Sequence, residues 1–272
     1  MLTLKYADKT AVVLPEYGFN TVSIRFGEKE LLRTAPSMEV YAEDPCIWGI
    51  PTLLPPNRTE DGVFHFEGKR YALPINEERI HNHLHGYVHR SPFTVTARSE
   101  NSAEGYFENH GEIFPFPFAI KGAALLDGTG YHLRFTVENI GGTNMPLVFA
   151  LHANFRRPEY FRVPLGERWE TTSRAIPTGN LLPLRETERA WAEGTAPKGN
   201  IGGFFTSRGH EAALDGHKWR VSENFDQWVL WSGEGFLSME PQRGAVNALN
   251  NGVGKMILAP GERETFTAEV VE

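Results

Sequence analysis

The sequence predicts an all-β fold, a large antiparallel sandwich or barrel, and three observations support this prediction. The dominant hydrophobic period is two, helical patterns are almost absent, and the 27 Gly and 18 Pro are spread along the chain. Alternation of apolar and polar residues is the mark of a half-buried strand. Many short strands separated by turns are typical of antiparallel sandwiches and barrels. Such folds reach this size undivided, so we expect one domain over residues 1–272.

The clearest predicted strand covers residues 131–138, in which every second side chain is apolar. The C-terminal residues 265–270 repeat that alternation. Similar patterns predict further strands at residues 21–26, 92–99, 146–155 and 227–232. Turns are expected at the glycine- and proline-containing segments 127–130, 141–142 and 260–261. One short helix is expected at residues 185–193.

Composition excludes several classes of function. The hydrophobic share of 40%, with 18 Phe, 8 Tyr and 6 Trp, supplies a sizeable core. A formal net charge of −7 without a run of Lys or Arg argues against nucleic acid or an anionic membrane as partner. The single cysteine, Cys46, cannot form an internal disulfide. Polar residues follow the N-terminus too early for a signal peptide, so we expect a cytoplasmic protein. We expect a monomer or a homodimer.

Histidines gather in one segment, where four of the ten fall between His81 and His89. If this stretch is extended, His81, His83, His85 and His89 share one face, because side chains alternate along a strand. Three interpretations remain open for this segment. It could bind a metal through neutral imidazoles, hold one histidine for acid–base catalysis, or form a polar strand edge without a role.

Two further segments end apolar strands on a titratable group. His152 closes the apolar residues 147–151, where it is either a core histidine or a proton-transfer group tuned by burial. Glu240 closes residues 235–239 and is followed by Pro241. A carboxylate there is costly to bury unless it is paired or catalytic, and the alternative is a strand-end Glu in solvent.

The segment 49–58 is apolar, rich in proline, and ends in Arg58. A rigidly held guanidinium presents a fixed fork of donors that suits sugar hydroxyls. The alternative is a surface arginine at the end of a loop.

Taken in order, these motifs resemble the aldose 1-epimerase (galactose mutarotase-like) family over nearly the whole chain. The matching segments are Gly49-Ile50-Pro51, Asn57-Arg58, Asp61-Gly62-Val63-Phe64, Leu73-Pro74-Ile75-Asn76-Glu77, Asn82-His83-Leu84-His85-Gly86, His152 with Phe155, Pro177-Thr178-Gly179, and Glu240-Pro241-Gln242. The resemblance implies a large antiparallel β-sandwich (a supersandwich) with an open sugar cleft. It implies an isomerase that interconverts the α and β anomers of a free sugar without metal or other cofactor.

Carried over to this sequence, the resemblance makes Glu240 the general base and His152 the general acid of ring opening. It makes His85 a stabiliser of charge at the ring oxygen, and it assigns sugar binding to Arg58 with Asn57. Mutarotation needs one proton taken from the anomeric hydroxyl and one given to the ring oxygen, so two groups of opposite protonation state suit it. An aromatic ring is also expected to stack on the sugar, and Trp48 is the candidate.

The chain departs from the family pattern at three places. Tyr87 replaces a second glycine after Leu-His-Gly, and Ala153-Asn154 stands where many members have Pro-Tyr. The segment 199–205, where many members carry an acidic sugar ligand, has no Asp. A sugar other than galactose, or a modified one, is therefore compatible with the motifs.

Three alternatives accompany this interpretation. A hexose-6-phosphate epimerase would need a basic pocket, for which Arg79, Arg90, Arg156 and Arg157 are available. A metal-dependent cupin-type enzyme would use His83, His85 and His89, although no Glu follows at the expected spacing. A non-catalytic carbohydrate-binding protein would keep the aromatic residues and have no need of His152 with Glu240.

Overall fold

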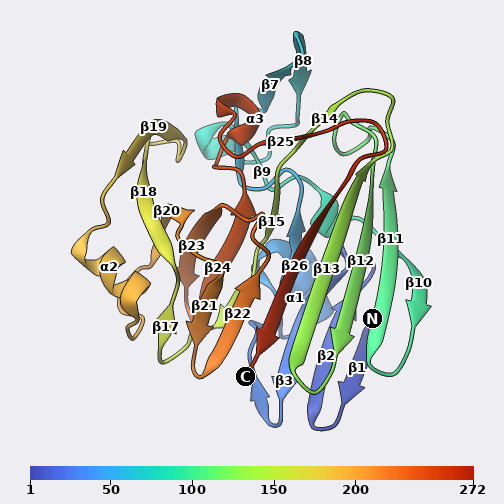
Figure 1. Cartoon of the computed structure of the whole chain (residues 1–272), viewed down its shortest axis with the longest axis vertical. Helices are drawn as coiled ribbons and strands as arrows, with labels where there is room; N and C mark the ends of the chain where they lie inside the picture. The colour runs from blue at the N-terminus through green and yellow to red at the C-terminus, as the bar shows by residue number, and fades with distance from the viewer.

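Two eight-stranded antiparallel sheets form the body of the computed structural model, which describes all residues from Met1 to Glu272 (Figure 1). The first sheet has the order β10 (Thr94–Arg98), β11 (Ser102–Asn109), β12 (Phe118–Leu126), β13 (Gly130–Asn139), β26 (Arg263–Val271), β22 (His217–Val221), β21 (Glu211–Leu214), β17 (Phe161–Arg162). The second has the order β19 (Pro177–Leu182), β18 (Leu165–Thr171), β20 (Gly202–Ser207), β23 (Gln227–Gly233), β24 (Phe236–Arg243), β15 (Phe149–Leu151), β5 (Thr52–Leu53), and β16 (Asn154–Arg156) also pairs with β24.

Smaller elements surround these sheets. A four-stranded sheet contains β1 (Leu2–Tyr6), β2 (Lys9–Leu14), β3 (Asn20–Phe26) and β4 (Lys29–Glu30). Two-stranded pairs join β14 (Met145–Leu147) to β25 (Met256–Leu258), β6 (Arg58–Glu60) to β9 (Asn82–Leu84), and β7 (Val63–Phe66) to β8 (Lys69–Ala72), the last of which projects at the top of Figure 1. The helices are α1 (Met38–Glu43), α2 (Glu186–Glu193) and α3 (Ala248–Asn251), with 3-10 turns η1 (Pro45–Ile47), η2 (Glu78–Ile80) and η3 (Val88–Arg90). No helix is long and apolar enough to span a bilayer.

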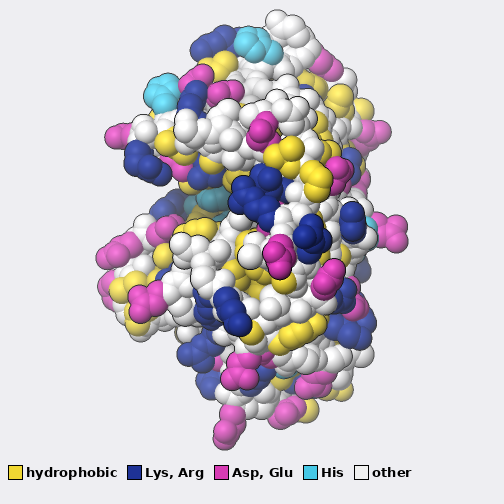
Figure 2. Space-filling view, turned by 90° about the vertical axis from the view of Figure 1, so that its left-hand side faces the viewer, with side chains coloured by type: hydrophobic (Ala, Val, Ile, Leu, Met, Phe, Trp, Pro, Cys, Tyr) yellow, Lys and Arg dark blue, Asp and Glu magenta, His cyan; other side chains and the backbone are white.

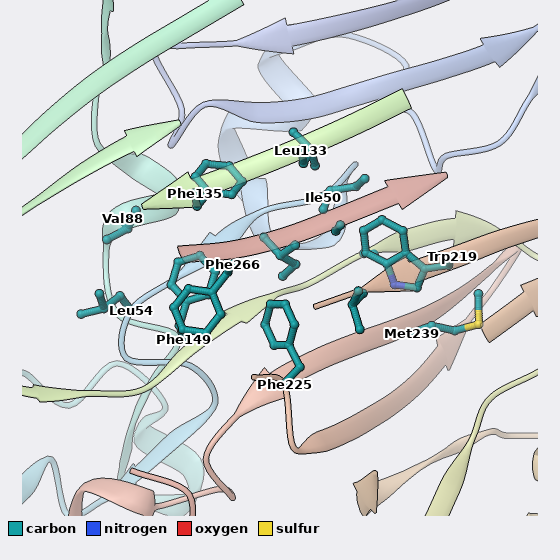
Figure 3. Packing of buried hydrophobic residues seen from close by; sticks show 14 of the residues in the cluster. Ile50, Leu54, Val88, Leu133, Phe135, Phe149, Trp219, Phe225, Met239 and Phe266 are labelled. Atoms are coloured by element: carbon teal, nitrogen blue, oxygen red, sulfur yellow. The ribbon is translucent and has the colours of Figure 1, made fainter. Parts of the chain in front are cut away.

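The hydrophobic core lies between the two large sheets. The ring of Phe266 on β26 stacks on that of Phe149 on β15, with centroids 4.4 Å apart, and Phe135 packs beside them (Figure 3). Burial of each such ring stabilises the fold by ~1.5–3 kcal/mol. One cluster of 55 buried residues extends from Leu2 to Val270, so the first and last strands share the same core.

The period-two prediction is confirmed in the main strands. The strand expected at residues 131–138 is β13, the one at 265–270 is β26, and those at 21–26, 92–99 and 227–232 are β3, β10 and β23. The expected helix at 185–193 is α2. The single strand expected at 146–155 is instead divided into β14, β15 and β16. Pairing with β24 stops after Ala150 and resumes at Asn154, while the amide of His152 still donates to the carbonyl of Pro51 beside β5.

Candidate active site

A cleft of about 860 Å³ opens over the second large sheet. Figure 2 shows a recess on this side of the molecule, with a histidine side chain in its depth. Its volume is within the range of small-molecule sites. The structure brings together on its lining five of the side chains predicted to act on or bind a sugar: Asn57, Arg58, His85, His152 and Glu240.

His152 and Glu240 face each other on the floor of the cleft. The register of β15 and β16 with β24 is continuous on either side of them, with Ala150 opposite Gln242 and Asn154 opposite Ser238. This register places His152 directly opposite Glu240. Nε2 of His152 lies 3.3 Å from Oε1 of Glu240, and the two side chains are only 6% and 3% exposed.

Burial opposes charge on both members of this pair. It raises the pKa of Glu240 well above that of an exposed glutamate, an effect that nearby Arg58 partly offsets. It lowers the pKa of His152 below that of an exposed histidine, and the Asn154 side chain acts in the opposite direction. The pair therefore holds one proton between them near neutral pH, carried either by the Glu240 carboxyl or by the imidazole.

His85 is held as a neutral donor by its neighbour Asn57. The backbone N–H of Asn57 donates to Nδ1 of His85 over 3.3 Å, and the backbone N–H of His85 donates to the backbone carbonyl of Asn57 over 2.9 Å. Nδ1 is therefore an acceptor, which places the proton of the neutral ring on Nε2. Burial lowers the pKa of His85 far below its ordinary value, so the ring is uncharged at neutral pH.

The turn that carries His85 depends on glycine at the next position. His85 and Gly86 both have positive φ, 67° and 59°. A Cβ at Gly86 would come within 2.1 Å of the Leu54 carbonyl oxygen, so only glycine permits this close approach. The Leu-His-Gly motif thus turns the chain sharply and brings His85 to the wall of the cleft.

Arg58 is fixed by a bidentate ion pair with Glu77. Nε and Nη2 of Arg58 each donate to a carboxylate oxygen of Glu77 over 2.8 Å, and Nη1 donates to Oδ1 of Asn57. Such a fork holds the guanidinium plane in one orientation. Glu77 belongs to the Leu-Pro-Ile-Asn-Glu segment of the family pattern, so that motif supplies the partner of the predicted sugar-binding arginine.

The expectation that four histidines share one face is wrong. His81 has left-handed backbone and pairs with Asp61 in solvent, and His83 is buried with Nδ1 2.7 Å from the Pro74 carbonyl oxygen. The segment is not one extended strand, because β9 ends at Leu84 and the turn at residues 85–86 follows. Among these histidines only His85 and His89 line the cleft. No group of three or more His, Cys, Asp and Glu side chains is arranged to hold a metal ion.

Trp231, Tyr87 and Phe204 are the aromatic residues that line the cleft, and the candidate Trp48 lies outside the lining. Trp48 is only 8% exposed, packs in a small hydrophobic cluster of its own, and is covered by the Arg33 guanidinium 4.2 Å from its ring. Trp231 is 44% exposed, and its ring centroid lies 6.3 Å from that of His152. The sequence does not predict this exposure, since strand alternation alone does not distinguish a core side chain from one that lines a cleft.

The space beside Trp231 is open. Gly202 on β20 is directly opposite Trp231 on β23 and also lines the cleft. A Cβ at Gly202 would meet nothing closer than the Leu230 carbonyl oxygen at 3.6 Å. The segment in which many family members carry an acidic ligand therefore leaves one edge of this cleft uncharged.

The arginines considered for a phosphate pocket are dispersed. Arg90 lines the cleft, and its guanidinium makes only long contacts with the carbonyls of Ala42 and Glu43. Arg156 and Arg157 line a different hollow, and Arg79 lies outside the lining of the cleft.

A further hollow of about 690 Å³ lies on the outer face of the first large sheet. Its histidine, His132, contacts Asp127 and Glu269, and Arg220 pairs with Glu211 and Glu269. These charges are satisfied by one another, whereas the titratable groups of the 860 Å³ cleft are buried beside open space. The latter is the candidate active site.

Comparison with known proteins identifies the family of the chain. The model of the family described as aldose 1-epimerase matches residues 1–270. The Escherichia coli K12 protein YihR, itself described as uncharacterized, is 26% identical over 236 residues, which cover 77% of this chain and 74% of YihR.

Solved structures show the same fold. A galactose mutarotase-like protein of Clostridium acetobutylicum is similar at a TM-score of 0.89 and 23% identity, covering 98% of this chain and 93% of the other. The GalM/aldose epimerase homologue from C. elegans is similar at a TM-score of 0.83 and 16% identity, covering 99% and 98%. The predicted galactose mutarotase-like β-sandwich is thereby confirmed.

Proposed function

The chain belongs to the aldose 1-epimerase family, and from this we propose that it interconverts the α and β anomers of a free aldose. The observation that carries the proposal is the contact of 3.3 Å between His152 Nε2 and Glu240 Oε1 inside a cleft of sugar size. A shared proton between two buried groups of opposite type is what ring opening and closing require.

In the proposed reaction Glu240 as carboxylate takes the proton of the anomeric hydroxyl, and His152 as imidazolium gives one to the ring oxygen. The ring opens to an aldehyde, the C1–C2 bond rotates, and the ring closes with the two proton transfers reversed. The proton that burial favours on Glu240 reaches His152 across their contact. The positive charge of Arg58 favours this arrangement, because it lowers the pKa of Glu240.

The remaining lining residues have binding roles in this proposal. Nε2–H of neutral His85 donates to the ring oxygen as charge develops there. Arg58 keeps one free N–H on each of Nη1 and Nη2 beyond its bonds to Glu77 and Asn57, and these donate to sugar hydroxyls. Asn57 positions both His85 and Arg58. The exposed ring of Trp231 stacks on the apolar face of the sugar. We propose that the small-molecule sugar is the only partner the reaction needs, and that the chain works without metal, cofactor, nucleic acid or membrane.

A phosphorylated aldose is the second candidate substrate, because Arg90 lines the cleft without a carboxylate partner. The free aldose is preferred, since the other three arginines considered for a phosphate pocket lie outside the cleft lining.

Polarimetry tests the proposal. Freshly dissolved α-D-glucose, α-D-galactose and α-D-glucose 6-phosphate would be followed with the wild type and with Glu240→Gln. We expect faster relaxation of at least one free sugar with the wild type and no acceleration with the variant. Acceleration of the phosphorylated sugar alone would select the second candidate. Binding of sugars by calorimetry without any acceleration would identify a non-catalytic carbohydrate-binding protein.

A further inference from the structure

Asn154 is a buried polar residue beside the catalytic pair to which the proposed reaction gives no role. It begins β16, two positions after His152, just as its partner Ser238 lies two positions before Glu240 on β24. It is opposite Ser238 on β24, as His152 is opposite Glu240. Its side chain is fully buried, and a buried amide is costly unless its hydrogen bonds are made.

The side-chain amide of Asn154 makes all its hydrogen bonds with groups around the active site. Nδ2 donates to the carbonyl oxygens of His152, Cys46 and Gly49 over 2.8, 3.0 and 3.3 Å. Oδ1 accepts from Oγ of Ser238 over 2.6 Å. Three carbonyl acceptors on one side fix the orientation of the amide, so Oδ1 points away from them. Asn154 thereby ties the backbone of His152 to the cleft wall at Cys46 and to β24.

His152 has one ring nitrogen without a hydrogen-bond partner. Its Nδ1 is buried and has no hydrogen-bond partner, while its Nε2 faces Glu240. If Glu240 donates the shared proton to Nε2, the neutral ring carries its own proton on Nδ1. If the proton has moved to His152, the imidazolium carries protons on both nitrogens. In either state Nδ1–H needs an acceptor, and Oδ1 of Asn154 retains a free lone pair.

On the basis of the proposed mutarotase function, we propose that Asn154 is the positioning residue of His152. Its Nδ2 holds the His152 backbone, and its Oδ1 accepts the Nδ1 proton throughout the reaction. The Asn154 side chain raises the pKa of His152, as an acceptor next to the imidazole would. Asn154 stands at the position where this chain departs from the Pro-Tyr of many family members. The proposed contact with His152 is therefore specific to chains that carry Asn at this position.

The test compares Asn154→Leu with Asn154→Asp, two variants of similar size and opposite effect on Nδ1. Nitrogen-15 NMR of the imidazole of His152 at neutral pH reports which nitrogen carries the proton. We expect Nδ1–H in the wild type, Nε2–H in Asn154→Leu, and Nδ1–H with increased imidazolium in Asn154→Asp. For Asn154→Leu we expect kcat to fall at least tenfold with KM unchanged. Ser238→Ala, which breaks the same buried network away from His152, should retain the wild-type tautomer.

A merely structural role would give different results. Identical tautomers in the wild type and both Asn154 variants, with circular dichroism showing folded chains, would overturn the proposal. A loss of kcat in Ser238→Ala as large as in Asn154→Leu would do the same. If Asn154→Leu does not fold, Asn154→Asp still decides, since its carboxylate must raise the imidazolium population. The NMR readout needs no substrate, so it remains informative even if no sugar is epimerised.

Discussion

His152 and Glu240 are cross-strand neighbours, and their side-chain atoms Nε2 and Oε1 are 3.3 Å apart where the ladder between β15 and β24 is interrupted. The two groups therefore do not need a flexible loop to meet. Strand register sets their separation. Burial raises the pKa of Glu240 and lowers that of His152, so the two groups share one proton. This geometry makes them one functional unit, from which the first prediction follows.

Removing either member should cost as much activity as removing both. Glu240→Gln and His152→Asn are each expected to lower kcat by ~10²–10⁴-fold, because a single remaining group cannot both take and give the proton. The double variant should lose little more than the worse single variant, since groups that act as a unit are not additive. Polarimetric kcat values measure this, and two independent losses that multiply would contradict it. Glu234→Gln and His65→Asn, both exposed, serve as controls.

Trp231 is expected to contribute affinity rather than rate. Trp231→Ala should raise KM about tenfold, equivalent to ~1.4 kcal/mol, with kcat nearly unchanged, because stacking holds the sugar equally before and during ring opening. Trp231→Phe should recover part of the loss. Tyr160→Ala removes a ring of equal exposure, 44%, from a different hollow and should change neither constant.

Fluorescence gives a second measurement for the same residue. Trp231 is the one exposed tryptophan, since the other five are each at most 8% exposed. A saturable change in emission on adding sugar should be present in the wild type and absent in Trp231→Phe. Persistence of the full change in that variant would place the sugar elsewhere.

Glu77 is expected to matter for sugar binding although it is absent from the cleft lining. Its carboxylate holds Nε and Nη2 of Arg58 in a fork. Glu77→Gln removes the charge and one of the two acceptors, so the guanidinium loses its fixed plane. We expect KM to rise about tenfold, and Arg58→Lys to show a similar increase because an ammonium cannot make the fork. The neighbouring exposed Glu78→Gln is the control, and an unchanged KM in Glu77→Gln would remove the assigned role.

The sequence predicts the sheets well because their physics is local. Alternation over residues 131–138 requires only that one face of a strand be buried, and β13 has that pattern in the structure. The same rule of alternation gives the wrong result for residues 81–89, because contacts with residues far away in the sequence set the conformation of this segment. The turn at His85 and Gly86 forms against the Leu54 carbonyl, and the Asn57 amide fixes the ring of His85.

The candidate site was predictable mainly from the order of motifs and only in part from single residues. The candidate residues converge because β24 pairs with β15 and β6 pairs with β9, and no local pattern encodes either pairing. They are Asn57, Arg58, His85, His152 and Glu240. Trp48 and Trp231 show the limit of reasoning from residue type. Both are tryptophans, yet Arg33 covers Trp48, whereas open space beside Gly202 exposes Trp231.

Acid should destabilise the protein through its buried neutral histidines, and His89 allows this to be measured. Burial lowers the pKa of His89 from 6.5 to about 3, so the folded state resists protonation that the unfolded chain accepts. The contribution of neutral His89 is therefore complete above pH ~6.5 and is lost as the pH falls from there toward 3, by at most ~1.4 kcal/mol per pH unit.

His89→Gln should remove this part of the pH dependence. The free energy of unfolding in urea, measured for both chains at pH 7.5, 6.0 and 5.0, should fall less steeply for the variant. Any pH-independent cost of the substitution cancels, because only the slopes are compared. His65→Gln is the control for replacing a histidine at an exposed position. Equal slopes for wild type and His89→Gln would mean that His89 takes up its proton in the folded cleft as readily as in the unfolded chain.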